Sequence, residues 1–311
     1  MFETPVAVFI FNRPHLTQRV LDRIRQIRPT RLLIVADGPR QFRADDIEKC
    51  RQTRALFEHI DWKCERLTNY SEENLGCKKR VASGLDWVFH VCEEAIIVED
   101  DCLPSLSFFS FCAELIERYR LNTRLMHISG DNFQQGQLRG QASYYFSRYA
   151  HVWGWASWQR AWRHYDVTMR TWPEMKRQQM LSTILDDPVE RNYWTGIFDR
   201  GHAGLVDTWD YQWLYACWCQ KGLSILPNVN LVTNIGSGAD ATHTKGEIGE
   251  LEIPCYDLPA LIHPSVVDRD AGADRFTFDE HYGGRQLRAE QSPRRRTRRF
   301  LGSLKRSLGF N

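Results

Sequence analysis

The sequence predicts an α/β/α sandwich, with a mostly parallel central sheet and an irregular, helix-rich C-terminal half. Over residues 5–132, short apolar runs typical of strands buried on both faces alternate with stretches whose apolar residues recur at helical spacing. Alternating strands and helices of this kind form right-handed crossovers and a mostly parallel sheet. Three of the apolar runs also end in acidic residues. A parallel sheet gathers such residues at one edge, where open α/β sheets bind ligands.

The N-terminal elements follow from apolar runs, helical spacing and turn residues. Pro14 suits the first turn of a helix that ends before Pro29, and Asp37-Gly38-Pro39 forms a turn after the second strand. We expect strands at residues 6–11, 32–36, 62–67, 95–98 and 125–129, and helices at 14–27, 44–59, 81–92 and 106–119.

The second half has a less regular pattern and many Trp and Tyr residues. The stretch 228–250 is expected to consist mainly of loops, and the arginine-dense stretch 285–299 is expected to be poorly ordered. Helices are expected near residues 156–165, 174–185, 188–200 and 209–221.

Composition limits the class of protein. Hydrophobic residues make up 42% and charged residues 26% of the chain, and the formal net charge of +2 gives no reason to expect a specific nucleic-acid partner. No apolar stretch approaches the roughly 20 residues that cross a bilayer, and no basic leader precedes the first strand. The nine cysteines lack paired Cys-x-x-Cys units, so we expect reduced thiols and a cytoplasmic protein.

The acidic triplet Glu99, Asp100 and Asp101 is the strongest functional signal. It directly follows the apolar run 95–98, so it is expected at the carboxyl edge of the sheet. Three adjacent carboxylates repel one another and therefore suggest a cation. Hard oxygen ligands suit Mg²⁺ or Mn²⁺, usually shared with a phosphate-bearing substrate. Taken alone, an acidic turn after a strand explains the triplet equally well.

Two further strand ends carry acids, and a basic run precedes the central strand. Asp37 and Asp131 follow the second and fifth strands, although an ordinary Asp-Gly turn also accounts for Asp37. Lys78 and Arg80 lie near the start of the helix before the triplet. They could reach phosphate groups, or they could form a solvated basic helix start. The first strand is followed neither by Gly-x-Gly-x-x-Gly nor by a P-loop, which argues against those two nucleotide-binding folds.

The order of motifs resembles that of GT-A glycosyltransferases, and most of all the N-acetylglucosaminyltransferase I type. The resemblance rests on the triplet at 99–101 with Pro104-Ser105 and Phe108-Phe109 after it. It continues with the turn 129–132, the segment Trp153-Gly154-Trp155 and the pair Trp209-Asp210, and it covers roughly residues 5–245.

This resemblance implies an inverting, metal-dependent transfer of a sugar from a nucleotide-diphosphate sugar, with UDP as the nucleotide. Asp101 would be the direct metal ligand, for Mn²⁺ or Mg²⁺, while Glu99 and Asp100 would contact ribose or the donor sugar. Asp37 would contact the base. Asp210 would be the general base, with Asp207 as an alternative because Tyr211 stands where the family has a second acid.

Other candidates are assigned by the same resemblance. Trp153 and Trp155 are candidate platforms for the sugar, although burial in the core is the competing interpretation for at least one of them. His243 ends a glycine-rich loop and would bind metal or phosphate. The remaining donor-binding candidates are Asn12, Arg13, Lys78, Arg80 and Asp131.

The chain divides into a donor-binding half (1–132), an acceptor and catalytic half of the same domain (133–284) and a basic amphipathic tail (285–311). Within 293–311 the apolar residues share one helical face among many arginines. This pattern favours an anionic membrane surface, and a disordered tail with weak, non-specific affinity for nucleic acid is the alternative. Such a tail would fit a glycan or lipid-linked acceptor and a role in cell-surface polysaccharide synthesis. It would also fit a peripheral position on the inner face of the membrane.

Two other functions stay open. A sugar nucleotidyltransferase would share the sheet and the metal, but residues 11–14 lack its glycine-rich, Arg-Lys signature. A non-catalytic nucleotide- or carbohydrate-binding protein would have no need of an intact acidic triplet.

Overall fold

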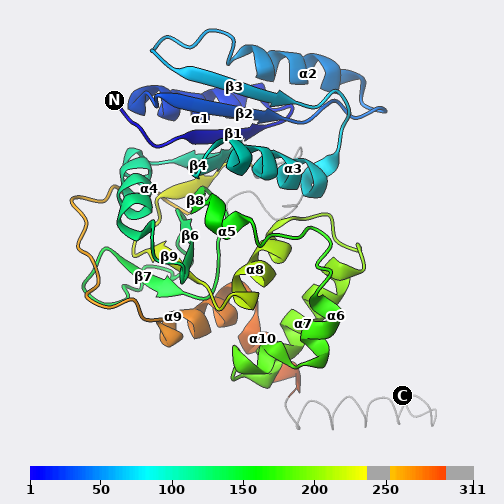
Figure 1. Cartoon of the computed structure of the whole chain (residues 1–311), viewed down its shortest axis with the longest axis vertical. Coiled ribbons are helices and arrows are strands. Elements are labelled where there is room, and N and C mark those ends of the chain that lie inside the picture. The colour runs from blue at the N-terminus through cyan, green and yellow to red at the C-terminus, as the bar shows by residue number, and fades with distance from the viewer. Residues whose placement is uncertain (237–252, 292–311) are drawn as a thin grey trace, which may run out of the picture.

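An eight-stranded sheet forms the centre of the structure, a computed structural model that describes residues 1–236 and 253–291 (Figure 1). The strands lie in the order β3-β2-β1-β4-β8-β6-β9-β7. Their bounds are β1 Val6–Ile10, β2 Arg31–Ala36, β3 Glu65–Tyr70, β4 Glu94–Glu99, β6 Leu125–Ser129, β7 Tyr144–Ser147, β8 Trp155–Trp158 and β9 Leu223–Pro227.

The sheet is mostly parallel, as predicted. Strands β3, β2, β1 and β4 run parallel to one another, and β6 runs parallel to β9. Strand β8 lies between β4 and β6 and is antiparallel to both, so β6 has the direction of β4. Strand β7 is antiparallel to β9 at the edge. The structure therefore confirms the α/β/α sandwich with its helix-rich second half.

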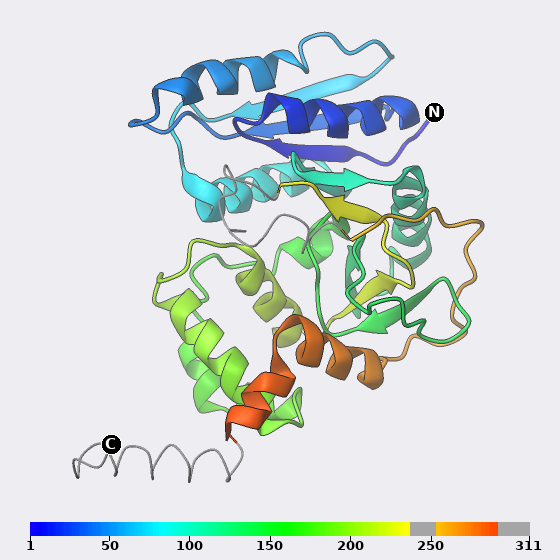
Figure 2. The same cartoon turned by 180° about the vertical axis from the view of Figure 1, so that it is seen from behind.

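Helices cover both faces of the sheet, which explains why the strands are continuously apolar. Val6, Val8 and Ile10 pack under α1 (Pro14–Ile27) and α4 (Leu106–Tyr119), whereas Ala7 and Phe9 face the other way, under α3 (Gly76–Val91). Figures 1 and 2 show these two faces in turn. Helix α2 (Ala44–Ala55) lies beside α1 near the β3 edge.

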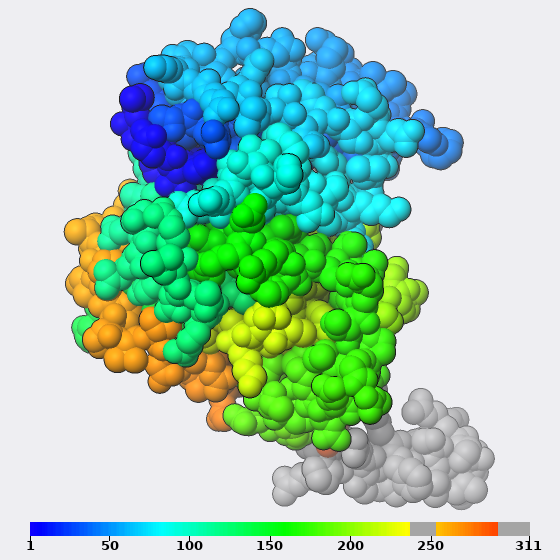
Figure 3. All heavy atoms as spheres, in the orientation of Figure 1, coloured from blue at the N-terminus to red at the C-terminus, as the bar shows by residue number. Residues whose placement is uncertain are grey.

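The second half adds a mainly helical layer. Helices α6 (Trp172–Arg177), α7 (Pro188–His202) and α8 (Asp210–Cys219) share an aromatic core that includes Trp172, Trp194 and Trp218. The C-terminal elements are α9 (Ala271–Phe276), a π-helical turn (Thr277–His281) and α10 (Gly284–Gln291). The space-filling view shows the N-terminal part, in blue and cyan, stacked on this second half (Figure 3). Within the described residues, no helix is long and apolar enough to span a membrane.

A short antiparallel ribbon lies beside the sheet. It pairs β5 (Cys102–Pro104) with β10 (Val232–Asn234), and the latter falls in the stretch that the sequence predicted to be loops. Val232 leaves very little room beneath it: a Cβ added to Gly130 would lie 2.6 Å from Val232 and 2.8 Å from the Gly154 carbonyl oxygen. Gly154 also has a φ of 65°, which favours glycine.

Several predicted boundaries are wrong. The helix predicted at 156–165 is strand β8 followed by the four-residue helix α5 (Gln159–Trp162). The three-residue spacing of Trp155 and Trp158 looks helical, but the two side chains lie on opposite faces of a strand and enter different cores.

Other boundaries differ for local reasons. The helix predicted at 174–185 divides into α6 and a 3₁₀ turn (Met180–Thr183), because Gln179 between them has a left-handed φ of 55°. The predicted 44–59 helix ends at Ala55, and the third strand is shifted to Glu65–Tyr70. Residues 285–291, predicted to be poorly ordered, belong to α10, where Arg288 forms ion pairs with Asp187 and Asp279.

The crowding around Gly130 gives a stability prediction. We expect Gly130→Ala to lower the free energy of unfolding by about 1–3 kcal/mol, since the new methyl group overlaps Val232 and backbone. The matched control is Gly196→Ala inside α7, where no atom lies within 4 Å of the added Cβ, and it should stabilise by about 0.5–1 kcal/mol. Urea unfolding measures both, and equal effects of the two variants would contradict the packing around Gly130.

Candidate active site

The main cavity of the site has a volume of about 460 Å³ and lies at the carboxyl ends of β1, β2 and β4. Strands β1 and β4 are neighbours in the sheet but are far apart in the chain, so the cavity sits at a topological switch point. One wall carries the acidic triplet. The opposite wall comes from the second half and includes Trp153 and residues 207–210.

The three acids of the triplet have different surroundings. Asp100 points into the protein, where its carboxylate accepts hydrogen bonds from the Phe11 backbone N–H (3.1 Å) and from Arg13 (2.6 Å). Asp101 lies closer to solvent and accepts a second bond from Arg13 at 3.0 Å. The single guanidinium of Arg13, at the start of α1, thus holds two of the three carboxylates.

Glu99 is partly buried and lines the cavity. Burial, reinforced by the neighbouring charges of Asp101 and Asp100, raises the pKa of Glu99 to about 8. Burial also raises the pKa of Asp100 to about 6, against the opposing effect of Arg13. Glu99 is therefore largely protonated near neutral pH, and a second cation beside Arg13 would relieve the repulsion that keeps it so.

The β5–β10 ribbon fixes Asp101 from its other side. The Ile235 N–H donates to the Asp101 backbone oxygen at 2.7 Å, and a Cβ added to Gly236 would lie 2.3 Å from the Asp101 carboxylate. Only a residue without a side chain fits there. The glycine-rich segment thus contacts the metal candidate through Gly236, whereas His243 lies outside the described residues.

The opposite wall is held by a layer of aromatic rings. Trp209 stacks on Trp155 with ring centroids 5.5 Å apart, and the Trp213 indole N–H donates to His127 Nδ1 at 3.1 Å. These contacts hold the first turns of α8, whose first residue is Asp210. The Asp210 carboxylate accepts a hydrogen bond from the Thr208 hydroxyl. Its charge helps to raise the pKa of Glu99 across the cavity.

Asp207 faces a different element from Asp210. Its carboxylate accepts a hydrogen bond from the Lys78 backbone N–H (3.3 Å) in the first turn of α3, and it lies against Gly76. Asp207 is exposed and ties the loop before α8 to the N-terminus of α3. Lys78 itself is not among the residues that line the cavity.

Asp37 and Arg80 line the cavity, but their hydrogen-bonding groups are used within the protein. The Asp37 carboxylate accepts bonds from the N–H groups of Gly38, Leu75 and Gly76 and from the Asn74 amide. These four bonds fill the acceptor positions of a carboxylate. Arg80 donates to backbone carbonyls at the ends of two strands and to the Asn69 side chain. Both residues therefore shape the edge of the sheet.

The two tryptophans predicted as sugar platforms lie in different places. Trp153 lines the cavity, whereas Trp155 is fully buried in the core between His127 and Trp209. Its indole therefore has no access to a ligand. Through its stacking on Trp209, Trp155 supports the start of α8. Asp131 is also fully buried, and its carboxylate accepts a hydrogen bond from the Trp153 N–H.

Sequence reasoning missed several lining residues. Arg40 lies over the Phe11 ring, 5.3 Å from its centroid, and pairs with Asp46, which also accepts a bond from Asn12. Asn12 does not line the cavity. Arg40 follows the turn at the end of β2. The strand-end rule, by which residues after parallel strands gather at one edge of the sheet, could therefore have found it. Asn234 and Gly236 belong to the glycine-rich segment that ends at His243, but their contact with the site follows from pairing with β5, which the sequence did not predict.

The residues present fit a divalent cation that is shared with a substrate. Glu99 and Asp101 supply hard oxygen ligands, and a bound cation would relieve the repulsion among the three crowded acids. Among residues 1–236 and 253–291, no three His, Cys, Asp or Glu side chains form a ready-made metal cage. One or two carboxylates together with substrate phosphates are how proteins commonly hold Mg²⁺.

Two solved structures show a remote likeness to this chain. No family model and no curated protein sequence matches the chain. The chain is similar to the galactosyltransferase LgtC in complex with donor and acceptor sugar analogues, with a TM-score of 0.36 and 10% identity over 69% of this chain and 70% of that one. It is also similar to UDP-glucose pyrophosphorylase complexed with UDP-glucose, with a TM-score of 0.27, 12% identity and coverage of 47% of this chain. It spans 62% of that protein, less than two thirds of its length. The function is therefore argued from the site itself.

The buried histidine behind α8 gives a pH prediction. His127 donates from Nε2 to the His151 carbonyl and accepts at Nδ1 from Trp213, so it is neutral in the fold, and burial lowers its pKa to about 4. The unfolded chain takes up this proton near pH 6.5. We therefore expect the contribution of His127 to decrease the free energy of unfolding by about 1 kcal/mol when the pH falls from 6.5 to 5.5.

Urea unfolding of the wild type and of His127→Gln at pH 7.5, 6.5 and 5.5 measures this contribution. The variant should be less stable at every pH, because it loses packing, but its stability should fall less steeply with acidification. Parallel pH profiles for the two proteins would show that His127 does not resist protonation.

Proposed function

We propose that this protein is an inverting glycosyltransferase that moves a sugar from a nucleotide-diphosphate sugar to a hydroxyl group of an acceptor. One observation carries the proposal. A single cavity at the switch point of the sheet has the acidic triplet on one wall and the carboxylate of Asp210 on the other. The resemblance of the motifs to GT-A glycosyltransferases supports the same assignment.

The triplet wall would bind the donor. Glu99 and Asp101 would hold Mn²⁺ or Mg²⁺ against the donor diphosphate. When bound, the cation stabilises the negative charge that develops on the leaving nucleotide diphosphate. Asp100 has a different task, because it is buried and anchors both Phe11 and Arg13. Arg13 holds Asp100 and Asp101 and lines the cavity that would receive the diphosphate.

Asp210 is the better of the two candidates for the general base. A base must face the reacting hydroxyl within the cavity, and its carboxylate must be held in a fixed orientation. Asp210 meets both requirements through Thr208 and the packed start of α8. Asp207 is exposed and is engaged with the N-terminus of α3. Asp210 would take the acceptor proton while the acceptor oxygen attacks the anomeric carbon and the bond to the phosphate oxygen breaks.

The sugar of the donor would lie beside Trp153. The ring of Trp153 packs edge-on against Phe133, with centroids 5.0 Å apart, and its backbone is held by Asp131. A rigid aromatic face offers apolar contact to the C–H groups of a sugar. We extend this proposal to UDP as the nucleotide and to a glycan or lipid-linked acceptor. The role would be polysaccharide synthesis at the inner membrane surface. His243 and residues 293–311, on which parts of it depend, lie outside the described residues.

The donor side is tested by binding. Titration calorimetry should show UDP binding that requires Mn²⁺, and Asp101→Asn should weaken it at least about tenfold because one charged ligand is lost. Asp45→Asn, a change to an exposed acid on α2 that pairs with Lys49, is the matched control and should bind UDP normally. Metal-dependent UDP binding of normal affinity in Asp101→Asn would show that Asp101 is not a metal ligand.

The base is tested by turnover with a panel of UDP-sugars and acceptors. Asp210→Asn should slow turnover, measured as the rate at which UDP forms, by a factor of about 10²–10⁴ and leave UDP affinity unchanged. Asp207→Asn should keep most of the activity, since it keeps the size of the side chain at the start of α3. The reverse pattern would make Asp207 the base. Transfer of a nucleotidyl group in place of a sugar would identify a nucleotidyltransferase, which has no use for a base on the Asp210 wall.

A further inference from the structure

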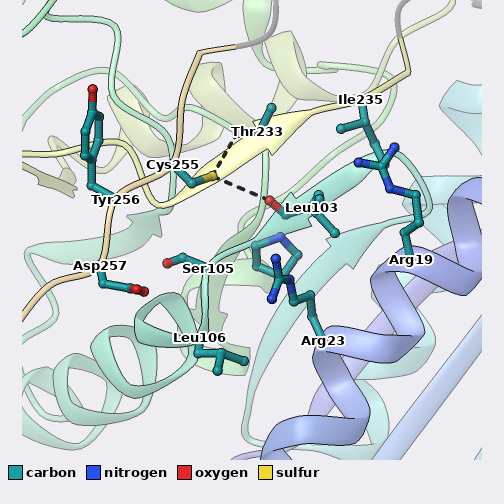
Figure 4. Close-up of a pocket in the computed structure, with 11 residues that line it drawn as sticks. Arg19, Arg23, Leu103, Ser105, Leu106, Thr233, Ile235, Cys255, Tyr256 and Asp257 are labelled. Carbon is teal, nitrogen blue, oxygen red and sulfur yellow. Dashed lines mark hydrogen bonds between the residues drawn. The ribbon is translucent and has the colours of Figure 1, made fainter.

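A second cavity, of about 340 Å³, lies on the other face of the β5–β10 ribbon (Figure 4). Side chains alternate between the two faces of a strand. Accordingly, Asn234 and Gly236 line the active-site cavity, whereas Thr233 and Ile235 line the second one. The remaining walls come from α1, from the start of α4 and from residues 255–257. The ribbon separates the two cavities.

Two arginines form one end of this second cavity. Arg19 and Arg23 lie one helical turn apart on α1, and Figure 4 shows both side chains extending toward the ribbon. Arg25 on the same helix has acidic partners, Asp22 and Asp61. Neither Arg19 nor Arg23 makes an ion pair or a side-chain hydrogen bond with any residue in the described part of the chain. Two guanidinium groups of this kind suit a phosphate or a carboxylate.

The other end of the cavity has the opposite character. The Asp257 carboxylate accepts a hydrogen bond from the Ser107 hydroxyl and lies across Ser105 from the arginines (Figure 4). The Ser105 and Ser107 hydroxyls are 3.0 Å apart, so this end is rich in hydroxyl and carboxylate oxygens. Such groups bind the hydroxyl groups of a ligand and disfavour a second anion.

We propose that this cavity is a binding site for an anionic monosaccharide unit. Its phosphate or carboxylate would lie between Arg19 and Arg23, and its hydroxyls would face Asp257 and Ser105. The volume suits a ligand of this size. The proposal does not depend on glycosyl transfer at the first cavity, because it concerns a separate set of side chains.

Ligand-observed NMR on the full-length protein tests the site, with glucose 6-phosphate and glucuronate as probes. Both should bind, whereas glucose should not, because it lacks the anionic group. Arg19→Gln and Arg23→Gln should each weaken binding about tenfold, and the double variant should abolish it. Arg43→Gln is the matched control: it removes the same charge from an exposed position outside both cavities. Its binding should equal that of the wild type.

The two probes and the variants separate the outcomes. Binding of only one probe would identify phosphate or carboxylate as the recognised group. If inorganic phosphate binds as tightly as glucose 6-phosphate, the sugar part of the proposal is wrong. In that case Asp257→Asn would leave the affinity for glucose 6-phosphate unchanged. Anionic-sugar binding that persists in the double arginine variant, or no binding by the wild type, would overturn the site. Because the readout is binding at Arg19 and Arg23, neither result bears on transfer at Asp210.

Discussion

The active-site edge of the sheet depends on one partly buried guanidinium, that of Arg13. Arg13 binds Asp100 and Asp101 directly after β4, while Asp100 in turn binds the Phe11 N–H directly after β1. These contacts join two strands that are adjacent in the sheet but separated by more than eighty residues of chain. The same cation offsets repulsion among carboxylates that the fold forces together. Without it, the three acids at the end of β4 could not occupy a partly buried edge.

The second wall is built by a different kind of interaction. A layer of tryptophans on one face of the sheet supports α8, and His127 joins β6 to that helix through Trp213. Aromatic packing is rigid and covers a large area, so it fixes the position of Asp210 against the sheet. The site therefore combines a charged wall, held by hydrogen bonds, with an opposite wall that is held mainly by apolar contact.

The sequence revealed those features that leave a local pattern. Apolar runs located β2 and β6 closely, and helical spacing located α1 and α4, because these segments are buried on defined faces. The strand-end rule brought Glu99, Asp101 and Asp37 to one cavity. It could not show that Asp37 is saturated by Asn74 and the turn at the start of α3, since those contacts join segments far apart in sequence. For the same reason, the sequence did not predict the contact of Gly236 with Asp101, and it allowed core burial of one tryptophan at 153 or 155 without showing that it is Trp155.

The reversed strand β8 has a consequence for which parts of the chain supply the site. At this edge of the sheet the parallel strands end, so the residues that follow them lie there. An antiparallel strand begins at the same edge, so the residues that precede it lie there. The loop that leads into β8 therefore reaches the same edge and brings Trp153 into the cavity. Within this loop, Gly154 is fixed by its left-handed φ and by Val232, whereas the side chain of Trp153 faces the cavity. A backward strand in a parallel sheet thus lets a loop from the second half of the chain supply a side chain to the edge at which the parallel strands end.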